Sequence, residues 1–150
     1  EPWRNPYAMS KHYMETIAPH NALAMRFTTV YGPGAREKML IPKILKDDVE
    51  YINVDHSRDF IHIDDILTAV GTLIVNPIPR KPKFVDVGTG VSNNLLDILS
   101  HLNMEVKDKR MGTIFERKDN KANIGTLTKM GWMPTIDLFE YLKGEKDGDI

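Results

Sequence analysis

Tyr7 and Lys11 are four positions apart near the start of the chain. In a helix, positions i and i+4 share one face, so this spacing makes the phenol and the ammonium neighbours. A free tyrosine has a pKa of about 10, too high for an efficient base near pH 7, and a nearby cation lowers that pKa. The pair is therefore a candidate acid/base, although the same spacing also occurs by chance in purely structural helices.

The surrounding residues predict a helix over 5–18. Asn5 is a good N-cap, Pro6 fits the first helical position, and Pro19 ends the segment. Tyr7 then lies in the first turn, where the positive end of the helix dipole also favours a phenolate.

The composition is that of an ordinary globular protein and excludes several classes. The 150 residues are 41% hydrophobic and 27% charged, with a net charge of -1, so nothing indicates a nucleic-acid surface. No apolar run approaches the roughly 20 residues of a membrane span. The absence of cysteine excludes disulfides, thiol catalysis and thiolate metal sites, and it favours a cytoplasmic location. The chain starts with Glu1 and opens almost directly on the helix, as a piece of a longer protein would.

Strands and helices are expected to alternate, which is typical of an α/β fold. The expected strands are 22–27, 50–54, 59–63 and 84–87, with the first and last buried. The expected helices are 39–45, 64–75 capped by Asp64, one capped by Ser92, 124–130 and 136–142. The apolar face of the 64–75 helix is expected to carry Ile66, Leu67, Val70, Leu73 and Ile74. Prolines 77, 79 and 82 predict an exposed connection, and 144–150 a frayed tail.

Four short segments follow one another along nearly the whole chain. They are 7–11, 26–34, 58–65 and 87–90, the last followed by 122–123 and 131–134. In this order and spacing they resemble the extended short-chain dehydrogenase/reductases, the nucleotide-sugar epimerases and dehydratases of carbohydrate metabolism. The resemblance implies an α/β fold consisting of the C-terminal half of a Rossmann-like doubly wound parallel sheet plus a small substrate-binding lobe.

The resemblance also implies roles for Tyr7 and Lys11. Tyr7 matches the family's proton acceptor on a sugar hydroxyl, and Lys11 matches the lysine that bonds the nicotinamide ribose and keeps the tyrosine acidic. NAD is the implied cofactor and a nucleotide-diphosphate sugar the implied substrate. This chemistry is reasonable, because hydride transfer from a carbinol carbon requires removal of the hydroxyl proton.

Further positions match substrate and cofactor contacts of the family. Thr28 lies where the cofactor is expected and Thr29 where the substrate is expected, although two threonines can simply end a strand. Arg58 matches an arginine that grips the diphosphate, since a guanidinium suits paired phosphate oxygens. The alternative for Arg58 is a structural ion pair with Asp59, Asp64 or Asp65. Arg117 is a candidate second phosphate contact or part of a solvated charged run.

Other conspicuous residues are interpreted as structural. His62 sits in an apolar strand, and the histidines show no metal-ligand spacing, so no metal site is expected. The run 88–90 looks like a dinucleotide loop, yet Asn93 stands where the third glycine belongs, so a tight turn explains it better. Trp132 and Pro134 are interpreted as packing residues.

The family's glycine-rich NAD loop and the Ser/Thr upstream of the Tyr–Lys pair are missing from the sequence. We therefore expect a fragment, inactive by itself, of a nucleotide-sugar epimerase or dehydratase (an isomerase or lyase). The expected sheet part is 1–36 and 83–103, and the expected nucleotide-sugar lobe is 37–82 and 104–150. Partners would be a second copy or a missing N-terminal half. The alternative is a non-catalytic nucleotide-sugar-binding or assembly module.

Overall fold

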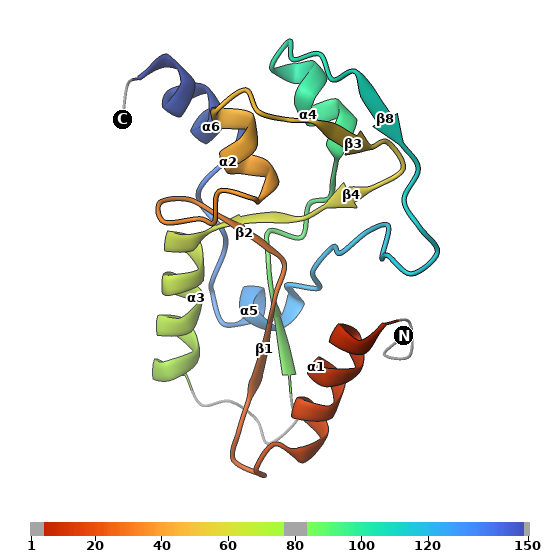
Figure 1. The fold of residues 1–150 in the computed structure, drawn as a ribbon. Helices are drawn as coiled ribbons and strands as arrows, with labels where there is room; N and C mark the ends of the chain where they lie inside the picture. Colours follow the sequence, from red (N-terminus) through yellow and green to blue (C-terminus); the bar gives the residue numbers. More distant parts are fainter. Residues whose placement is uncertain (1–4, 77–83, 149–150) are drawn as a thin grey trace.

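A computed structural model describes residues 5–76 and 84–148 as alternating helices and strands (Figure 1). The helices are α1 (Pro6–Ile17), α2 (Leu40–Leu45), α3 (Ile63–Val75), α4 (Leu95–His101), α5 (Gly125–Lys129) and α6 (Leu138–Asp147). The strands are β1 (Ala24–Phe27), β2 (Thr29–Tyr31), β3 (Tyr51–Asn53), β4 (Ser57–Arg58), β5 (Phe60–His62), β6 (Phe84–Val87), β7 (Asn93–Asn94) and β8 (Asp108–Arg110). This order confirms the predicted α/β class.

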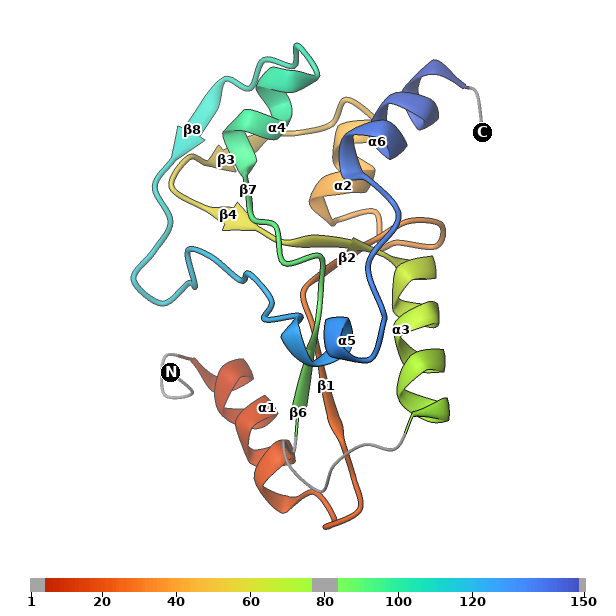
Figure 2. The ribbon, with the colours of Figure 1, turned by 180° about the vertical axis from the view of Figure 1, so that it is seen from behind.

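The strands pair two by two within the described residues, and most pairs are parallel. β1 pairs with β6, β2 with β5 and β3 with β8 in parallel, whereas β4 and β7 are antiparallel. β2 follows β1 after a single residue, and β5 follows β4 in the same way, so the chain passes from one pair directly into the next (Figures 1 and 2). Parallel pairing of segments far apart in sequence is what the predicted fold requires.

Buried side chains form two clusters on opposite sides of β5. The first cluster lies among α2, β3, α4 and α6, which gather in the upper part of both views, and the second among α3, β6 and α5 (Figures 1 and 2). Phe60 belongs to the first cluster and its neighbour Ile61 to the second, because successive strand side chains point to opposite faces. The division into a sheet part and a substrate lobe remains a prediction.

The cap of the first helix agrees with the sequence prediction, and two other caps do not. The Asn5 side chain accepts a hydrogen bond from the Ala8 N–H at 2.8 Å, as predicted. α3 is capped by His62, whose Nδ1 accepts from the Asp64 N–H, and not by Asp64. α4 is capped by Asn94 and not by Ser92. In both cases a strand runs directly into the helix, so the last strand residue takes the capping position.

Burial differs from the prediction at two elements. β1 is not a buried strand, since Met25 and Phe27 are exposed. On α3, Leu67 and Ile74 are also exposed, and Ala69 takes their place in the buried stripe. The 3.6-residue period allows a wider apolar stripe than the neighbouring elements actually cover.

The C-terminal third contains more regular structure than expected. β8 was not predicted, because its charged residues Asp108 and Arg110 do not look like a strand. α6 continues through Asp147, so the tail predicted to fray from residue 144 is helical up to that point. Prolines 77, 79 and 82 lie outside the described residues. No described helix is both long and apolar enough to cross a bilayer.

The carboxylate of Asp65 fastens α3 to the segment that precedes α6. It is buried and accepts hydrogen bonds from the N–H and hydroxyl of Thr135, both at 2.9 Å, and from the N–H of Ile136 at 3.1 Å. One turn later on α3, the Thr68 hydroxyl accepts from the Trp132 indole N–H at 2.9 Å. Trp132 is thus a packing residue, as predicted, with its polar edge satisfied.

Replacing Asp65 by alanine is expected to lower the free energy of unfolding by about 3 kcal/mol, because three hydrogen bonds to a buried carboxylate are lost together. The measurement is urea unfolding followed by circular dichroism. The matched control is Asp64→Ala, whose side chain is largely exposed and should change stability by only about 0.5 kcal/mol. Equal effects of the two substitutions would contradict this account of Asp65.

Candidate functional site

The carboxylate of Asp59 is the centre of the hydrogen-bonded network between β5 and the turn after β6. Its side chain is fully buried. Oδ1 accepts from the N–H and hydroxyl of Thr89, at 2.8 and 2.7 Å. Oδ2 accepts from the N–H groups of Gly90 and Ala122, at 2.9 and 3.1 Å. One acidic side chain therefore joins three segments that are far apart in sequence.

Gly88 is the place where these segments approach most closely. A Cβ atom there would lie 2.6 Å from the Ala122 Cβ and 2.7 Å from both Asp59 Oδ2 and the Thr28 Cγ2. The N–H groups of Thr89 and Gly90 point at Asp59 and are occupied by it. The run 88–90 is thus a turn around a buried carboxylate, in agreement with the interpretation that it is no dinucleotide loop.

Thr28 and Thr29 both reach this network. The Thr28 hydroxyl lies 3.5 Å from Asp59 Oδ1, the outer limit of a hydrogen bond. The Thr29 hydroxyl accepts from the Asn120 side-chain amide at 3.0 Å, and the same amide's oxygen accepts from the Asp59 N–H at 2.8 Å. Their roles in cofactor and substrate binding remain predictions, and the structure adds that both threonines sit where β1, β5 and the 120–122 segment meet.

Arg58, the residue before Asp59, points the other way and is held by main-chain oxygens. Its Nη1 donates to the carbonyl oxygens of Ser57 at 2.7 Å and Lys118 at 3.0 Å, and its Nη2 lies 3.1 Å from Nδ1 of His56. No ion pair of Arg58 with an aspartate occurs among the described residues, so the structural alternative predicted for it is not seen. Burial lowers the pKa of Arg58 from its ordinary value, and the nearby Glu116 and Asp119 carboxylates oppose that effect.

The segment 111–119 is fastened to the turn between β3 and β4. Asp55 accepts from the Gly112 N–H at 2.8 Å and pairs with Lys118 at 2.8 Å. These two contacts, the amide bond first, lower the pKa of Asp55 to about 2. The Ser57 N–H donates to the Lys118 carbonyl oxygen at 2.7 Å. Arg58 and this segment therefore have fixed relative positions.

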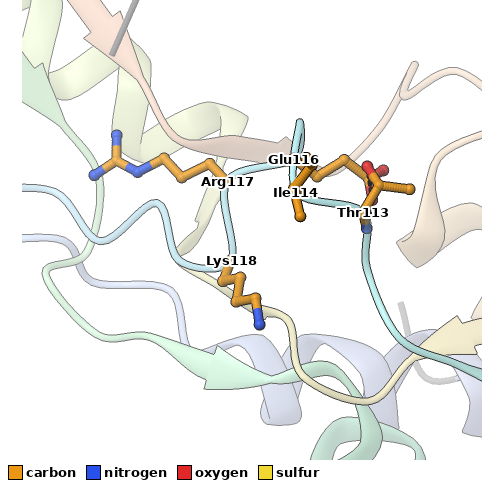
Figure 3. A pocket seen from close by; sticks show the side chains of 5 residues that line it. All are labelled: Thr113, Ile114, Glu116, Arg117 and Lys118. Atoms are coloured by element: carbon orange, nitrogen blue, oxygen red, sulfur yellow. Dashed lines mark hydrogen bonds between the residues drawn. The ribbon is translucent and has the colours of Figure 1, made fainter. Parts of the chain in front are cut away.

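A hollow of about 480 Å³ opens along the same segment (Figure 3). It is lined by Thr113, Ile114, Glu116, Arg117 and Lys118. Figure 3 shows the Arg117 side chain extending away from Glu116. The Glu116 carboxylate accepts a hydrogen bond from the Thr113 N–H at 2.9 Å. All five side chains are exposed, so the hollow is an open depression in the surface. Arg117 is near enough to Arg58 to lower the pKa of the latter, so the two predicted phosphate contacts lie in one region.

Tyr7 and Lys11 lie on one face of α1, as the spacing predicts. The Lys11 ammonium is 5.4 Å from the centroid of the Tyr7 ring, which is 72% exposed. No described residue of α1 is buried. The helix is tied to the rest of the chain by an ion pair from Glu15 to Arg26 and by a hydrogen bond from the Asn5 side chain to the Phe115 carbonyl oxygen. No recorded contact among the described residues joins this pair to Thr28 or Arg58.

The structure adds site residues that the sequence reasoning did not single out. Asp59 and Asp65 were considered only as partners of Arg58, and Asn120 and His56 were not considered. A carboxylate inside an apolar strand was the available signal for Asp59, because such a group must find several donors. Among residues 5–76 and 84–148, no group of three acidic or histidine side chains is placed to hold a metal ion.

Replacing Gly88 by alanine is expected to destabilise the chain by about 1–3 kcal/mol, since the added methyl group overlaps Asp59, Thr28 and Ala122. Gly71→Ala is the matched control, because nothing lies within 4 Å of the position its Cβ would take and alanine favours a helix. That control should be neutral or gain up to about 1 kcal/mol. Denaturant unfolding of both variants makes the comparison, and a Gly88→Ala protein as stable as Gly71→Ala would refute the close approach.

Comparison with known proteins connects this geometry to a family. The sequence profile of the NAD dependent epimerase/dehydratase family matches residues 1–88. CDP-abequose synthase of Salmonella typhimurium is 31% identical over 93% of this chain and 53% of its own length. UDP-glucuronate 4-epimerase of Thermodesulfobacterium geofontis is 30% identical over 93% of this chain and 48% of its own. The chain thus spans about half the length of these relatives.

Solved structures show the same fold. A UDP-glucuronic acid 4-epimerase from Bacillus cereus, in complex with UDP-glucuronic acid and NAD, superposes with a TM-score of 0.76 at 25% identity, over 95% of this chain and 52% of that one. An NAD-dependent NDP-hexosamine 5,6-dehydratase superposes with a TM-score of 0.78 at 24% identity, over the same shares of the two chains. These similarities confirm the Rossmann-like fold class predicted from the sequence. The chain belongs to the NAD-dependent epimerase/dehydratase family.

Proposed function

We propose that this chain provides the acid/base pair and the nucleotide-sugar contacts of an NAD-dependent epimerase or dehydratase. Tyr7 takes the proton from a sugar hydroxyl, and Lys11 holds the nicotinamide ribose. The observation that carries the proposal is the arrangement of these two side chains. They share an exposed face of α1, inside the region that matches the family profile.

The chain fits one end of NAD and not the other. The Lys11 ammonium and the Tyr7 hydroxyl are donors suited to ribose oxygens, and Thr28 lies at the end of β1. The amides of Thr89 and Gly90 in the turn 88–90 donate to Asp59 and are not free for a pyrophosphate. NAD, when bound, takes a hydride from a substrate carbon or returns it.

Arg58 and Arg117, with Thr29, make up the proposed contact to a nucleotide-diphosphate sugar. Arg58 is supported by geometry, since three acceptors hold its guanidinium in place. Its Nε–H and one Nη2 hydrogen have no recorded partner among the described residues. Two remaining N–H groups on a fixed guanidinium suit phosphate oxygens. Arg117 supplies a second positive charge beside the same hollow.

Catalysis on this proposal needs a dinucleotide-binding part as well, so the 150 residues alone would be inactive. This is supported by the relatives, which are about twice as long. Both α1 and β1 carry exposed apolar side chains that suit contact with such a part or with a second copy, namely Met9, Tyr13, Met14, Ile17, Met25 and Phe27. A cytoplasmic location also remains a proposal.

A second candidate function is a nucleotide-sugar-binding or assembly module without catalysis. The observation that favours it is the occupied turn 88–90, which leaves the chain without an anion-binding glycine loop of its own. Calorimetric titration of the 150-residue chain with CDP-glucose, UDP-glucose and NAD separates the two functions. Sugar-nucleotide binding without NAD binding supports the binding module, whereas tight NAD binding by this chain alone contradicts it.

Tyr7→Phe is expected to lower turnover by about 10²–10⁴-fold, because it removes the hydroxyl that exchanges the proton and keeps the ring. The assay follows conversion of CDP- and UDP-sugars with NAD by a protein in which a dinucleotide-binding segment precedes Glu1. Tyr51→Phe is the matched control, since Tyr51 is an exposed tyrosine on β3 and has no proposed role. Unimpaired turnover in Tyr7→Phe would remove this residue from the mechanism.

A further inference from the structure

His56 is a buried histidine whose ring contacts the proposed phosphate-binding arginine. The side chain is 2% exposed, and its Nδ1 lies 3.1 Å from Arg58 Nη2 and 3.4 Å from the Asn53 side-chain nitrogen. The His56 carbonyl oxygen accepts from the Leu95 N–H, so the residue is also fixed by its main chain.

The partner of Nδ1 determines the protonation state of the ring. A guanidinium has only donors, so the atom that faces Arg58 Nη2 must be an acceptor. Nδ1 of His56 therefore carries no proton, and the ring is neutral with its hydrogen on Nε2. A protonated imidazole would have a donor at both nitrogens and could not accept this bond.

The surroundings of Nε2, the other ring nitrogen of His56, do not favour a histidine at this position. Nε2 is buried and has no hydrogen-bond partner among the described residues. It lies over Gly112, where an added Cβ would be only 2.0 Å away. An unsatisfied buried donor is unfavourable, so packing alone does not explain a histidine here. The hydrogen bond between His56 Nδ1 and Arg58 Nη2 explains why a histidine is present here.

We propose that His56 is a positioning residue, whose neutral imidazole holds the Arg58 guanidinium in the orientation that binds the diphosphate of a nucleotide sugar. The inference rests on the proposed function of Arg58. It adds that binding requires the neutral form of His56 and is lost when the ring is protonated.

The charges around His56 keep the ring neutral at physiological pH. Burial is the largest effect and lowers its pKa, and the positive charges of Arg58 and Lys118 act in the same direction. The carboxylates of Glu116 and Asp55 oppose them. Because the pKa is below its ordinary value, loss of binding is expected on the acidic side of about pH 6.5.

Calorimetry with UDP-glucose and CDP-glucose between pH 8 and pH 5 tests the inference. The phosphates of these sugars are diesters and do not titrate in that range. The wild-type chain should bind with constant affinity near pH 8 and progressively more weakly as the pH falls below about 6.5, the loss reaching about tenfold when the ring is fully protonated, as expected for one hydrogen bond to a charged group.

Three variants separate positioning from packing. His56→Asn keeps an acceptor near the place of Nδ1 and should bind as wild type at pH 8 and equally well at pH 5. His56→Leu removes the acceptor and should bind about tenfold more weakly at every pH. His20→Asn, the same change at an exposed histidine, should keep the wild-type pH profile. A His56→Asn protein that retains the acid loss would overturn the inference.

NMR of the ligand-free chain tests whether His56 positions Arg58 independently of whether Arg58 binds a nucleotide sugar. Nitrogen-15 NMR of the imidazole should show an unprotonated Nδ1 at pH 7, and the Arg58 Nη protons should exchange more slowly in wild type and His56→Asn than in His56→Leu. Protonation of Nδ1 at pH 7 would overturn the inference. If the wild-type chain binds no nucleotide sugar at any pH, the proposed role of Arg58 fails, and this NMR result alone then decides whether His56 positions the arginine.

Discussion

A carboxylate placed in the interior, away from water, must be surrounded by donors, and Asp59 meets this requirement with N–H and O–H groups. No lysine or arginine pairs with it among the described residues. The donors come from the turn after β6 and from the segment before α5, which also meet through the hydrogen bond from the Asn123 N–H to the Asp86 carboxylate and through the packing of α5 against β6. Because each donor would cost free energy if left alone in the interior, the network fixes these segments together or not at all.

The proposed ligand contacts follow from this constraint. Asp59 and Arg58 are adjacent in sequence, and strand geometry turns their side chains to opposite sides. When Asp59 is held inside, Arg58 must face the 111–119 segment, where the Lys118 carbonyl oxygen and His56 hold its guanidinium. Thr28 and Thr29 are fixed to the same network, directly or through Asn120. The Tyr7–Lys11 pair is different, because it depends on the local geometry of α1 and on few contacts with the remainder of the chain.

Local features were therefore predictable from the sequence, and the network was not. The first helix, with Asn5 and Pro6 at its start, follows from capping rules alone. The strands β1, β3, β5 and β6 were predicted from short apolar runs, whereas β2, β4 and β7 were not predicted. The caps of α3 and α4 were assigned wrongly, because the rules place a cap by residue type and cannot see that a strand runs directly into each helix, ending at His62 and Asn94. β8 was missed since a strand that consists of Asp108, Lys109 and Arg110 is recognisable only through its partner β3. Likewise, the side chain of Asp59 bonds to residues 30 or more positions away, and His56 bonds to Arg58 only after the chain has brought the two side chains together.

The most direct measurement of the central constraint is amide hydrogen exchange in wild type and in Asp59→Asn. The substitution is nearly isosteric, but it replaces one acceptor oxygen by an NH2 group that faces donors. The account predicts that the amides of Thr89, Gly90 and Ala122 lose protection together, while amides in α6 keep theirs. If the three amides stay as protected as in wild type, the buried carboxylate does not hold these segments in place, and the structure around Arg58 needs another explanation.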